Sequence, residues 1–570
     1  MSGTAGRTGE LSPEKRALLE LLLRDERTDG ARDGRIRRRG ESGPTPQSFA
    51  QRRLWMLEAL APGTPIYTVR AGLRLTGGLD HRVLTRSVNE VVRRHGALRT
   101  TFCMLDGEPV QVVAASTDMK IPIIPIDGGS AQDREQAAWR RADMEAARGF
   151  DLTTGPLFRA SLLALAPDDH LLLFTLHHIV ADGWSLGILL RELATIHQAY
   201  ARGEPSPLPE PPIQYTDYAL WQHEAAATGV LREHLGYWTR QLAGLPALNL
   251  PTTHPRPRVP GFAGERQHVI LAREVTEALA ALSNREGATI FMTLQAALQT
   301  LLSRWSGQDD FGIGTPIANR TRAETENVIG FFLNTLVLRS DVAGDPTFRD
   351  LLARVRETTM AAYAHQELPF ERLLEALRPP RDPSRTPLFQ VFFNLLNFAD
   401  ERLNRPVVPT DAPIEDDLAQ FDLTLYAGEH DHRLQLQLVY RTDLFDAATA
   451  GRLLGHLTIL LGEIAANPDR RLSALPFVTP QERGRIARQR GPVPSLWPAG
   501  QRTPDSAADG RSVPARLGEQ RRSSPQRIAV RSGRTEWSYH ELVTRADRIA
   551  RAVLDVAPGP ATRIAVLCDH

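Results

Sequence analysis

The chain has 570 residues, of which 42% are hydrophobic and 24% are charged, and its formal net charge is +1. This composition is typical of a soluble globular protein with more than one domain, and so small a charge gives no general attraction to nucleic acid or to an anionic membrane. No apolar run reaches the roughly 18–20 residues needed to span a bilayer, the start lacks the pattern of a signal peptide, and two cysteines, Cys103 and Cys568, argue against a disulfide framework or a zinc site. We therefore expect a cytoplasmic protein without a resident metal.

The first predicted element is a helix over residues 12–25. Ser12 is a good N-cap, Pro13 suits the first helical position, and leucines at helical spacing form an apolar face. Sequence rich in glycine and arginine follows, so residues 1–43 are predicted to be an N-terminal helix and a flexible connector. The helix either docks onto another subunit or lies on the body of the protein.

Residues 45–480 mix helical and strand patterns without a regular βαβ period, which predicts an α+β fold of layered sheet and helices. A strand pattern that ends in a turn occupies residues 71–80 and precedes a helical pattern at 81–96. An apolar strand pattern at 171–178 precedes a helical pattern at 185–200. The second of these successions contains the most informative stretch of the chain.

The sequence HHIVADGWS occupies residues 177–185, at the end of the predicted strand. Side chains alternate between the two faces of a strand, so His177 and His178 are expected to point in opposite directions, and one of them can face a cleft. A histidine placed before a glycine turn and a helix start suits proton transfer near neutral pH, and a helix N-terminus favours developing negative charge. A satisfied core histidine is the alternative that the residues alone leave open.

Sequence rich in proline, glycine, arginine and serine predicts a linker over residues 481–512. A new globular pattern occupies residues 513–570, with an amphipathic helix at 541–556. This last part reads as the N-terminal fragment of a second kind of domain.

The stretch at 177–185 resembles the HHxxxDG signature of the condensation domains of nonribosomal peptide synthetases. It carries Ala181 where many members have serine. Further stretches are similar to the other motifs of that family and stand in the same order: SFAQRRLWML (48–57), RHGALRTTF (94–102), YTDYALW (215–221), IGFFLNTLVLR (329–339), HQELPFE (365–371) and RDPSRTPLFQVFFN (381–394). By this resemblance the chain is identified as a member of the family.

The resemblance implies a fold of two chloramphenicol-acetyltransferase-like lobes that form a V-shaped pseudo-dimer, with the signature at their interface. The N-lobe would cover residues 44–215 and the C-lobe residues 216–480. A tunnel between them would admit substrates from both ends. The sequence itself shows no duplication.

The resemblance also implies a set of site residues. His178 would orient the attacking amine and accept its proton, and Asp182 would form a structural salt bridge with Arg320 that ties the signature loop to the second lobe. The full catalytic set implied in this way is His177, His178, Asp182 and Gly183.

Other positions are implied to line the tunnel. Gly183 would let a phosphopantetheine arm pass close to the backbone, or would serve as a turn glycine. Trp184 would form part of the tunnel wall. Asn334 would line the active site, or would be a buried asparagine that satisfies backbone groups.

The implied reaction is amide bond formation between a donor acyl thioester and the α-amine of an acceptor aminoacyl thioester. Both substrates arrive on 4'-phosphopantetheine arms of donor and acceptor carrier proteins, and the domain itself binds no cofactor. The histidines and the opening motif look most like domains that join an L-configured donor to an L-configured acceptor. A starter domain that takes a fatty-acyl donor stays open, as does a domain fed by an upstream synthetase subunit through the N-terminal helix.

The stretch EWSYHELVTRADRIARAVLD (536–555) resembles the beginning of an adenylation domain, so residues 513–570 are expected to be its truncated start. Two other function classes stay open for the main body. One is a free-standing acyltransferase that acts on a soluble acceptor, and the other is a noncatalytic platform that recruits carrier proteins.

Overall fold

The computed structural model describes residues 35–39, 43–60, 62–380, 382–396, 418–489, 513–532 and 535–556. Packing divides the chain into two compact units, Met1–Pro480 and Gln481–His570. The helix predicted at 12–25 and most of the linker predicted at 481–512 lie outside the described residues. Each unit is considered separately.

The first lobe of the large unit is built on a four-stranded sheet with the order β2-β7-β6-β5. Its strands are β2 (Thr68–Thr76), β5 (Ile123–Pro125), β6 (Phe158–Ala166) and β7 (Asp169–His177). The helices are α3 (His81–Arg94), α4 (Ala131–Ala147) and α5 (Gly183–Ala201). Residues of α3 and α5 share one buried cluster with the sheet, and residues of α4 share another. Because helices cover the sheet, most residues of β6 and β7 are buried.

A smaller sheet and a helix complete this lobe. The sheet has the order β1-β4-β3 and consists of β1 (Thr45–Pro46), β3 (Thr100–Leu105) and β4 (Glu108–Val113). The helix α2 (Phe49–Leu60) contacts the short turn that follows β7. The helix α6 (Tyr215–Ala227), which starts where the sequence places the boundary between the lobes, contacts β1.

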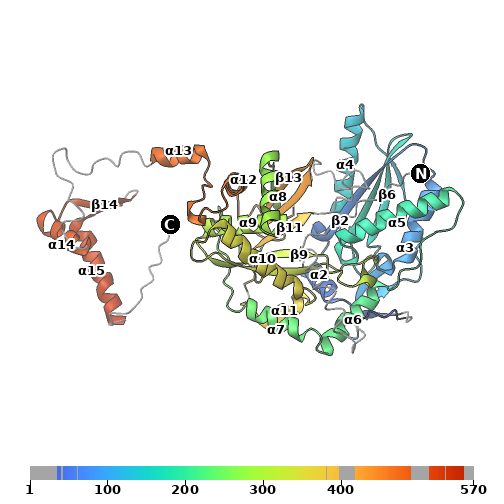
Figure 1. Cartoon of the computed structure of the whole chain (residues 1–570), viewed down its shortest axis with the longest axis horizontal. Helices are drawn as coiled ribbons and strands as arrows, with labels where there is room; N and C mark the ends of the chain where they lie inside the picture. The colour runs from blue at the N-terminus through green and yellow to red at the C-terminus, as the bar shows by residue number, and fades with distance from the viewer. Residues whose placement is uncertain are drawn as a thin grey trace, which may run out of the picture. The chain divides into compact units, whose positions relative to one another are not determined.

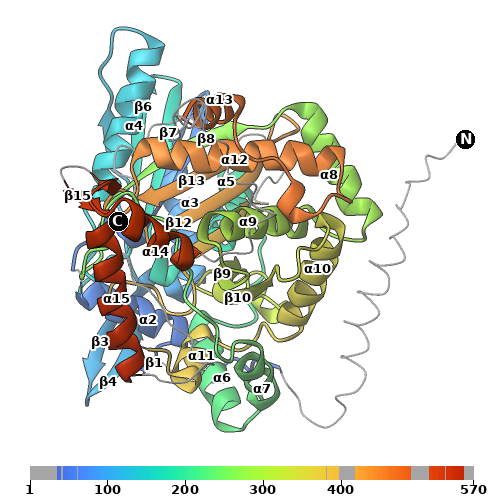
Figure 2. The same cartoon turned by 90° about the vertical axis from the view of Figure 1, so that its left-hand side faces the viewer.

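The second lobe is built on a six-stranded sheet with the order β10-β9-β11-β12-β13-β8. Its strands are β8 (Gly264–Ile270), β9 (Asp310–Ile317), β10 (Asn334–Asp341), β11 (Val391–Leu396), β12 (Leu423–His430) and β13 (Arg433–Arg441). The helices are α7 (Arg232–Gln241), α8 (Arg273–Arg285), α9 (Ile290–Ser306), α10 (Phe348–Ala364), α11 (Phe370–Leu377) and α12 (Ala447–Ala466). Figure 2 shows α8, α9 and α12 gathered on the sheet, and their apolar residues join its strands in one large core.

The two lobes repeat one topology. In the first, β2 pairs antiparallel with β7, β7 pairs antiparallel with β6, and β6 pairs parallel with β5. In the second, β8, β13, β12 and β11 follow the same sequence of pairings. The helices α3 and α5 follow β2 and β7, as α8 and α12 follow β8 and β13 (Figure 1). The duplication that the sequence does not show is therefore present in the fold.

The expected local structure of the large unit agrees with the structure. The strand predicted to end in a turn within 71–80 is β2, whose last residue is Thr76, and the helix predicted at 81–96 is α3. The strand predicted at 171–178 is β7, and the helix predicted at 185–200 is α5. Asp80 caps α3 by accepting hydrogen bonds from two backbone N–H groups, which explains why this helix starts where it does.

The lobes meet at a shared hydrophobic cluster. First-lobe residues such as Phe102 and Ile179 lie in it beside Tyr215 of α6 and residues 328–332 of the second lobe. Gly330 lies so close to Tyr215 that a Cβ atom there would stand 2.0 Å from a ring carbon. The segment around Gly330 therefore reaches the first lobe only because it carries a glycine at this position.

The small unit contains α14 (Val513–Ser523), the antiparallel pair β14 (Ile528–Ser532) and β15 (Thr535–Ser538), and α15 (Tyr539–Val556). The helix predicted at 541–556 is α15. The helix α13 (Pro480–Gln489) contains the boundary between the units. Among the helices of the described residues, none has the length and the apolar character that crossing a bilayer requires.

The packing at Gly330 gives a first prediction. Gly330→Ala forces the methyl group into the Tyr215 ring, and overpacking of this kind costs about 1–3 kcal/mol. Gly451→Ala, in the exposed part of α12 where a Cβ meets nothing within 4 Å, is the matched control and should be neutral or slightly stabilising. Calorimetry on the full chain measures both, and an equal melting temperature for the two variants would contradict the prediction.

Candidate active site

The signature stretch forms the connection between β7 and α5. The strand β7 ends at His177, a short 3-10 turn covers His178–Val180, and α5 begins at Gly183. His177 is buried, with 1% of its surface exposed, whereas His178 is half-buried. The two imidazoles therefore lie in different environments, as the alternation of side chains along a strand predicts.

His178 is held in one tautomer by the backbone. Its Nδ1 lies 2.8 Å from the carbonyl oxygen of Ala181. A carbonyl oxygen only accepts, so Nδ1 donates, and in the neutral ring Nε2 carries the lone pair. The Phe331 ring packs edge-on against the imidazole, with 5.1 Å between the ring centroids.

The surroundings of His178 also set its charge. Burial lowers the pKa of the His178 imidazole below its ordinary value of 6.5, and the negative charge of Asp182 opposes part of this shift. The ring is therefore neutral near pH 7. Its Nε2 can accept a hydrogen bond or a proton from an amine.

His177 is tied to the protein interior. Its Nδ1 accepts a hydrogen bond of 3.1 Å from the backbone N–H of Ile179. Its Nε2 lies 3.8 Å from a carboxylate oxygen of Glu58. The rings of Tyr67 and Phe150 pack beside its imidazole. This position gives His177 contact with the turn but leaves almost none of its surface for a substrate.

Asp182 caps α5 and joins the lobes. Its Oδ1 accepts hydrogen bonds from the backbone N–H and the hydroxyl of Ser185, at 2.8 and 2.7 Å. Its Oδ2 accepts from the backbone N–H of Phe332 in the second lobe, at 3.0 Å. Arg320, the partner that the resemblance implies, lies 3.2 Å from Oδ1, and both side chains are buried. The N–H of Ser185 is thus used by the cap and is not available to a developing oxyanion.

Arg320 holds the second-lobe segment in turn. Its Nη1 donates to the carbonyl oxygens of Thr325 and Val328, the latter at 2.7 Å, and its Nη2 donates to the Ser185 hydroxyl at 3.0 Å. The guanidinium also lies over the Phe332 ring, 4.1 Å from its centroid. Residues 320–332 are therefore clamped onto the signature loop.

Two of the residues predicted to line the tunnel, Gly183 and Trp184, lie at the start of α5. Gly183 is the first residue of α5 and does not take a left-handed conformation. Trp184 is 40% exposed and donates a hydrogen bond of 2.9 Å to the carbonyl oxygen of Glu326, so it lies against the second lobe.

Asn334 corresponds to the second of its two expected roles. Its Nδ2 donates to the carbonyl oxygens of Gln366 and Leu368, and its Oδ1 accepts from the N–H groups of Thr335 and Phe370. The side chain is buried and all of its polar atoms are occupied by backbone groups. Asn334 thereby joins β10 to the turn before α11.

A second polar network was not predicted from the sequence. Glu192 of α5 accepts hydrogen bonds from His95, at 3.0 Å, and from Arg94, at 2.8 and 3.0 Å. Burial alone would raise the pKa of Glu192, but these bonds and charges lower it to about 2. His95 also accepts from the N–H of Ile329, so this network binds α5 to the second-lobe segment. In the sequence, the only indication of this network is the stretch RHG at 94–96, inside the 94–102 motif.

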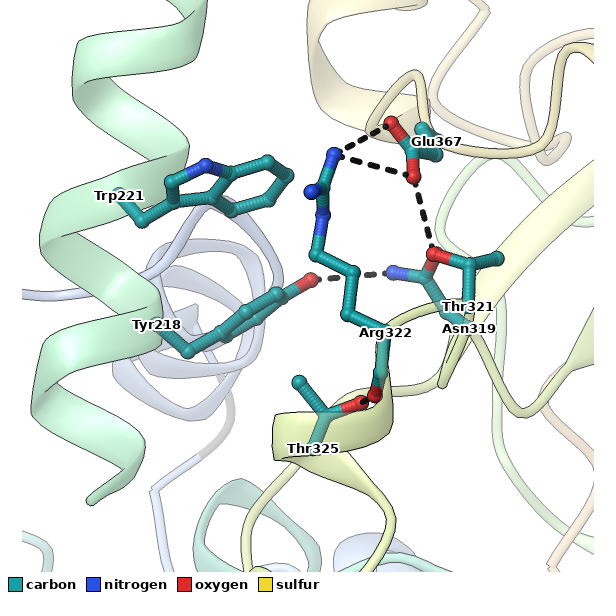
Figure 3. A pocket seen from close by; sticks show the side chains of 7 residues that line it. All are labelled: Tyr218, Trp221, Asn319, Thr321, Arg322, Thr325 and Glu367. Carbon is teal, nitrogen blue, oxygen red and sulfur yellow. Dashed lines mark hydrogen bonds and ion pairs between the residues drawn. The ribbon is translucent and has the colours of Figure 1, made fainter. Parts of the chain in front are cut away.

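A small pocket lies beside residues 320–332, between α6 and the second lobe (Figure 3). It is lined by Tyr218, Trp221, Asn319, Thr321, Arg322, Thr325 and Glu367. The Arg322 guanidinium lies between the Trp221 ring, 4.4 Å away, and the Glu367 carboxylate, 3.4 Å away. Contacts between these lining residues thus hold the walls of the pocket.

The second lobe contains the counterpart of the signature loop. Its strand β13 ends at Arg441, and five residues later Asp446 caps α12 by accepting from the N–H of Thr449 at 2.7 Å, as Asp182 does for α5. Thr442 stands where the first lobe has His178. The repeat has kept the helix cap but has a hydroxyl in place of the imidazole.

Comparison with known proteins agrees with this geometry. A family model described as a condensation domain matches residues 41–487. One of the linear gramicidin synthase proteins of Brevibacillus parabrevis is 43% identical over 509 residues, which are 89% of this chain and 10% of that protein. Phosphinothricin tripeptide synthetase PhsC of Streptomyces viridochromogenes is 38% identical over 571 residues, which are 99% of this chain and 51% of that protein.

The chain belongs to the condensation domain family. Condensation domains are acyltransferases, and those of nonribosomal peptide synthetases form peptide bonds between carrier-bound substrates. The chain spans only a tenth to a half of the length of these curated relatives.

Solved structures show the same fold. The X-domain from teicoplanin biosynthesis superposes with a TM-score of 0.70 at 28% identity, covering 78% of this chain and 100% of that chain. A four-domain nonribosomal peptide synthetase bound to AMP and glycine gives a TM-score of 0.69 at 23% identity, covering 90% of this chain and 39% of that chain. The α+β architecture of two acetyltransferase-like lobes is thereby shown. Among the described residues there is no group of three metal-ligating side chains.

The buried ion pair gives a second prediction. Asp182→Ala removes a helix cap and leaves Arg320 buried without its partner, which costs about 3–5 kcal/mol. Asp446→Ala removes the equivalent cap at an exposed position with no such pair among the described residues, so its loss of stability should be clearly smaller. Melting temperatures of the two full-length variants provide the measurement. Equal losses would show that the ion pair adds nothing to the cap.

Proposed function

We propose that residues 44–480 transfer a donor acyl group from its thioester to the α-amine of an acceptor, with both substrates on phosphopantetheine arms of carrier proteins. His178 is the residue that receives the amine. The observation that carries this proposal is the bond from Nδ1 to the Ala181 carbonyl, which leaves Nε2 as an acceptor on a neutral, half-buried ring.

Apart from His178, the reaction needs few further groups from the protein. The amine nitrogen attacks the thioester carbonyl carbon, the carbon–sulfur bond breaks, and the sulfur leaves as a thiolate. Nε2 of His178 takes the proton that the amine loses and can return it to the thiolate. An α-amine has a pKa of about 7.7–8.0, so roughly a tenth to a sixth of it is neutral at pH 7. Orientation of two tethered reactants supplies several kcal/mol of the barrier, up to roughly 7–11 in ideal cases.

Gly183 and Trp184 are proposed to border the path of the acceptor arm. Gly183 carries no side chain at the first position of α5, directly after the active-site turn. Trp184 is partly exposed beside it and is fixed by its bond to Glu326. The tunnel between the lobes is part of this proposal.

The finer assignments rest on the sequence motifs. The intact histidines and the opening motif favour a domain that joins L-configured donor and acceptor, and a starter or subunit-initiating domain is the alternative. Residues 513–570 are proposed to begin an adenylation domain. This is supported by the match to PhsC, which extends past the 41–487 matched by the condensation model. The N-terminal helix is proposed to dock onto an upstream synthetase protein, and a cytoplasmic setting is proposed from the low cysteine content.

A noncatalytic platform is the second candidate. One similar solved structure is a complex of the X-domain and OxyB from teicoplanin biosynthesis, with a TM-score of 0.69 at 27% identity. A fold of this kind thus takes part in a complex with another protein. The same assay separates the two candidates, because a platform recruits carriers without turnover.

The role of His178 gives a third prediction. His178→Ala should slow single-turnover transfer between two carrier domains, loaded from a panel of aminoacyl-coenzyme A thioesters, by at least ~10²-fold. Thr442→Ala, at the equivalent position of the second lobe, should leave the rate unchanged. Mass spectrometry of the acceptor arm measures the product.

Each outcome of that assay has a meaning. Dipeptide on the acceptor arm supports condensation, product released into solution supports a free-standing acyltransferase, and carrier binding without turnover supports a platform. A His178→Ala variant with near-wild-type transfer would contradict the proposed role of the imidazole.

The path at Gly183 gives a fourth prediction. Gly183→Leu should block transfer to the acceptor carrier while the protein stays folded, because leucine favours a helix more than glycine does. Ala447→Leu, at the exposed first position of α12, is the control and should transfer normally. Melting temperature and single-turnover rate are measured together. Wild-type transfer by Gly183→Leu would show that the arm takes another path.

A further inference from the structure

On the interior side of the signature turn, two buried polar atoms face each other. They are Nε2 of His177 and Oε2 of Glu58, which lie 3.8 Å apart. Within the described part of the chain, neither atom has a hydrogen-bond partner. His177 is 1% exposed and Glu58 is 7% exposed. Glu58 lies on α2, outside every residue assigned to the site so far.

The hydrogen bonds on the far sides of the two groups fix their orientation. His177 Nδ1 accepts from the N–H of Ile179, so in the neutral ring Nε2 carries the proton and directs it at Glu58. The other oxygen of Glu58 accepts from the N–H of Gly63 at 2.7 Å. The carboxylate thus accepts a hydrogen bond from the loop after α2 and stands 3.8 Å from the imidazole at the end of β7.

The neighbours of the pair do not replace this contact. The Tyr67 ring lies 6.1 Å and the Phe150 ring 6.0 Å from the His177 ring, measured between centroids. Burial raises the pKa of the Tyr67 hydroxyl, which therefore stays neutral. Arg53, a nearby cation on the same helix, pairs with Glu371. A buried carboxylate oxygen without a donor is costly, and the His177 N–H is the donor that faces it.

The contact between Glu58 and His177 is linked to the His178 imidazole through the backbone. Ile179 lies between His178 and Ala181, the two residues whose own hydrogen bond orients the His178 imidazole. A change in the His177 ring therefore displaces the N–H of Ile179 and the turn that holds His178. Hydrogen bonds join residues 177–181 into one unit, and the Glu58 carboxylate lies 3.8 Å from the imidazole at its buried end.

We propose that Glu58 is a positioning residue for the active site, which acts on His178 through His177 and the backbone of Ile179. Its contribution is to hold the His177 N–H, so that the turn keeps a single geometry and His178 keeps its half-buried place. The kinetic part of this inference rests on the proposed function, whereas the structural part does not.

The test uses Glu58→Gln in the full chain. A carboxamide has one acceptor oxygen, so it cannot serve both the Gly63 N–H and the His177 N–H. We expect a several-fold loss of single-turnover rate with little change in KM. Because the loosened turn exposes His178, its NMR titration midpoint should also rise toward 6.5. Glu108→Gln, at an exposed position on β4, is the matched control and should change neither quantity.

A double-mutant cycle tests whether Glu58 acts on His178 through His177. If Glu58 acts through His177, then Glu58→Gln adds nothing to the loss caused by His177→Gln, and the two effects are not additive. Glu58→Asp, which shortens the side chain but keeps both oxygens, serves as a second variant if Glu58→Gln fails to fold. It should show the same two changes to a smaller degree.

Two results would overturn the proposal. One is a lower melting temperature for Glu58→Gln with an unchanged rate and an unchanged His178 titration, which is the behaviour of a merely structural residue. The other is additivity with His177→Gln. If the wild-type chain transfers nothing at all, the proposed function fails. The response of the His178 titration to Glu58→Gln still decides this inference.

Discussion

The buried carboxylate of Asp182 is the point on which the rest of this structure depends. It caps α5, accepts the N–H of Phe332 and pairs with Arg320, so one side chain fixes a helix start, a strand connection and the contact between two lobes. A carboxylate with this little exposure is tolerated only when it is paired and hydrogen-bonded. The turn that carries His178 therefore depends on partners from both lobes, and neither lobe alone would supply them.

The duplicated topology explains why the domain has one such site. Both lobes start a helix shortly after a central strand, and both use an aspartate as the cap. In the second lobe the cap, Asp446, is exposed, and the strand ends at Arg441, which is buried and pairs with Asp443 and Asp422. Thr442, the counterpart of His178, carries a hydroxyl, which cannot act as a base near pH 7. The repeat supplies the strand, the turn and the helix cap twice, whereas of these two turns only the first carries an imidazole.

Much of the site was predictable because its signals are local. The apolar run, the two histidines and the Asp-Gly pair predicted a strand, a turn and a helix, and β7 and α5 have this form. The family resemblance placed Arg320 beside Asp182, where it lies. Asn334 was expected either to line the active site or to satisfy backbone groups, and its side chain makes four bonds to backbone groups. The Glu192 and Glu58 contacts were missed because their partners lie far away in the sequence, at Arg94, His95 and His177.

By itself the sequence determined the class of protein, the local elements and the imidazole at 178, since periodicity, capping residues and motif spacing are properties of neighbouring residues. Only the tertiary structure decided which nitrogen of His178 is free, what satisfies Asp182, and that the two lobes repeat one topology. The contacts of Asp182 and the repeat of the lobes arise from hydrogen bonds and packing between segments far apart in the chain. No local pattern encodes the distance or direction between such segments.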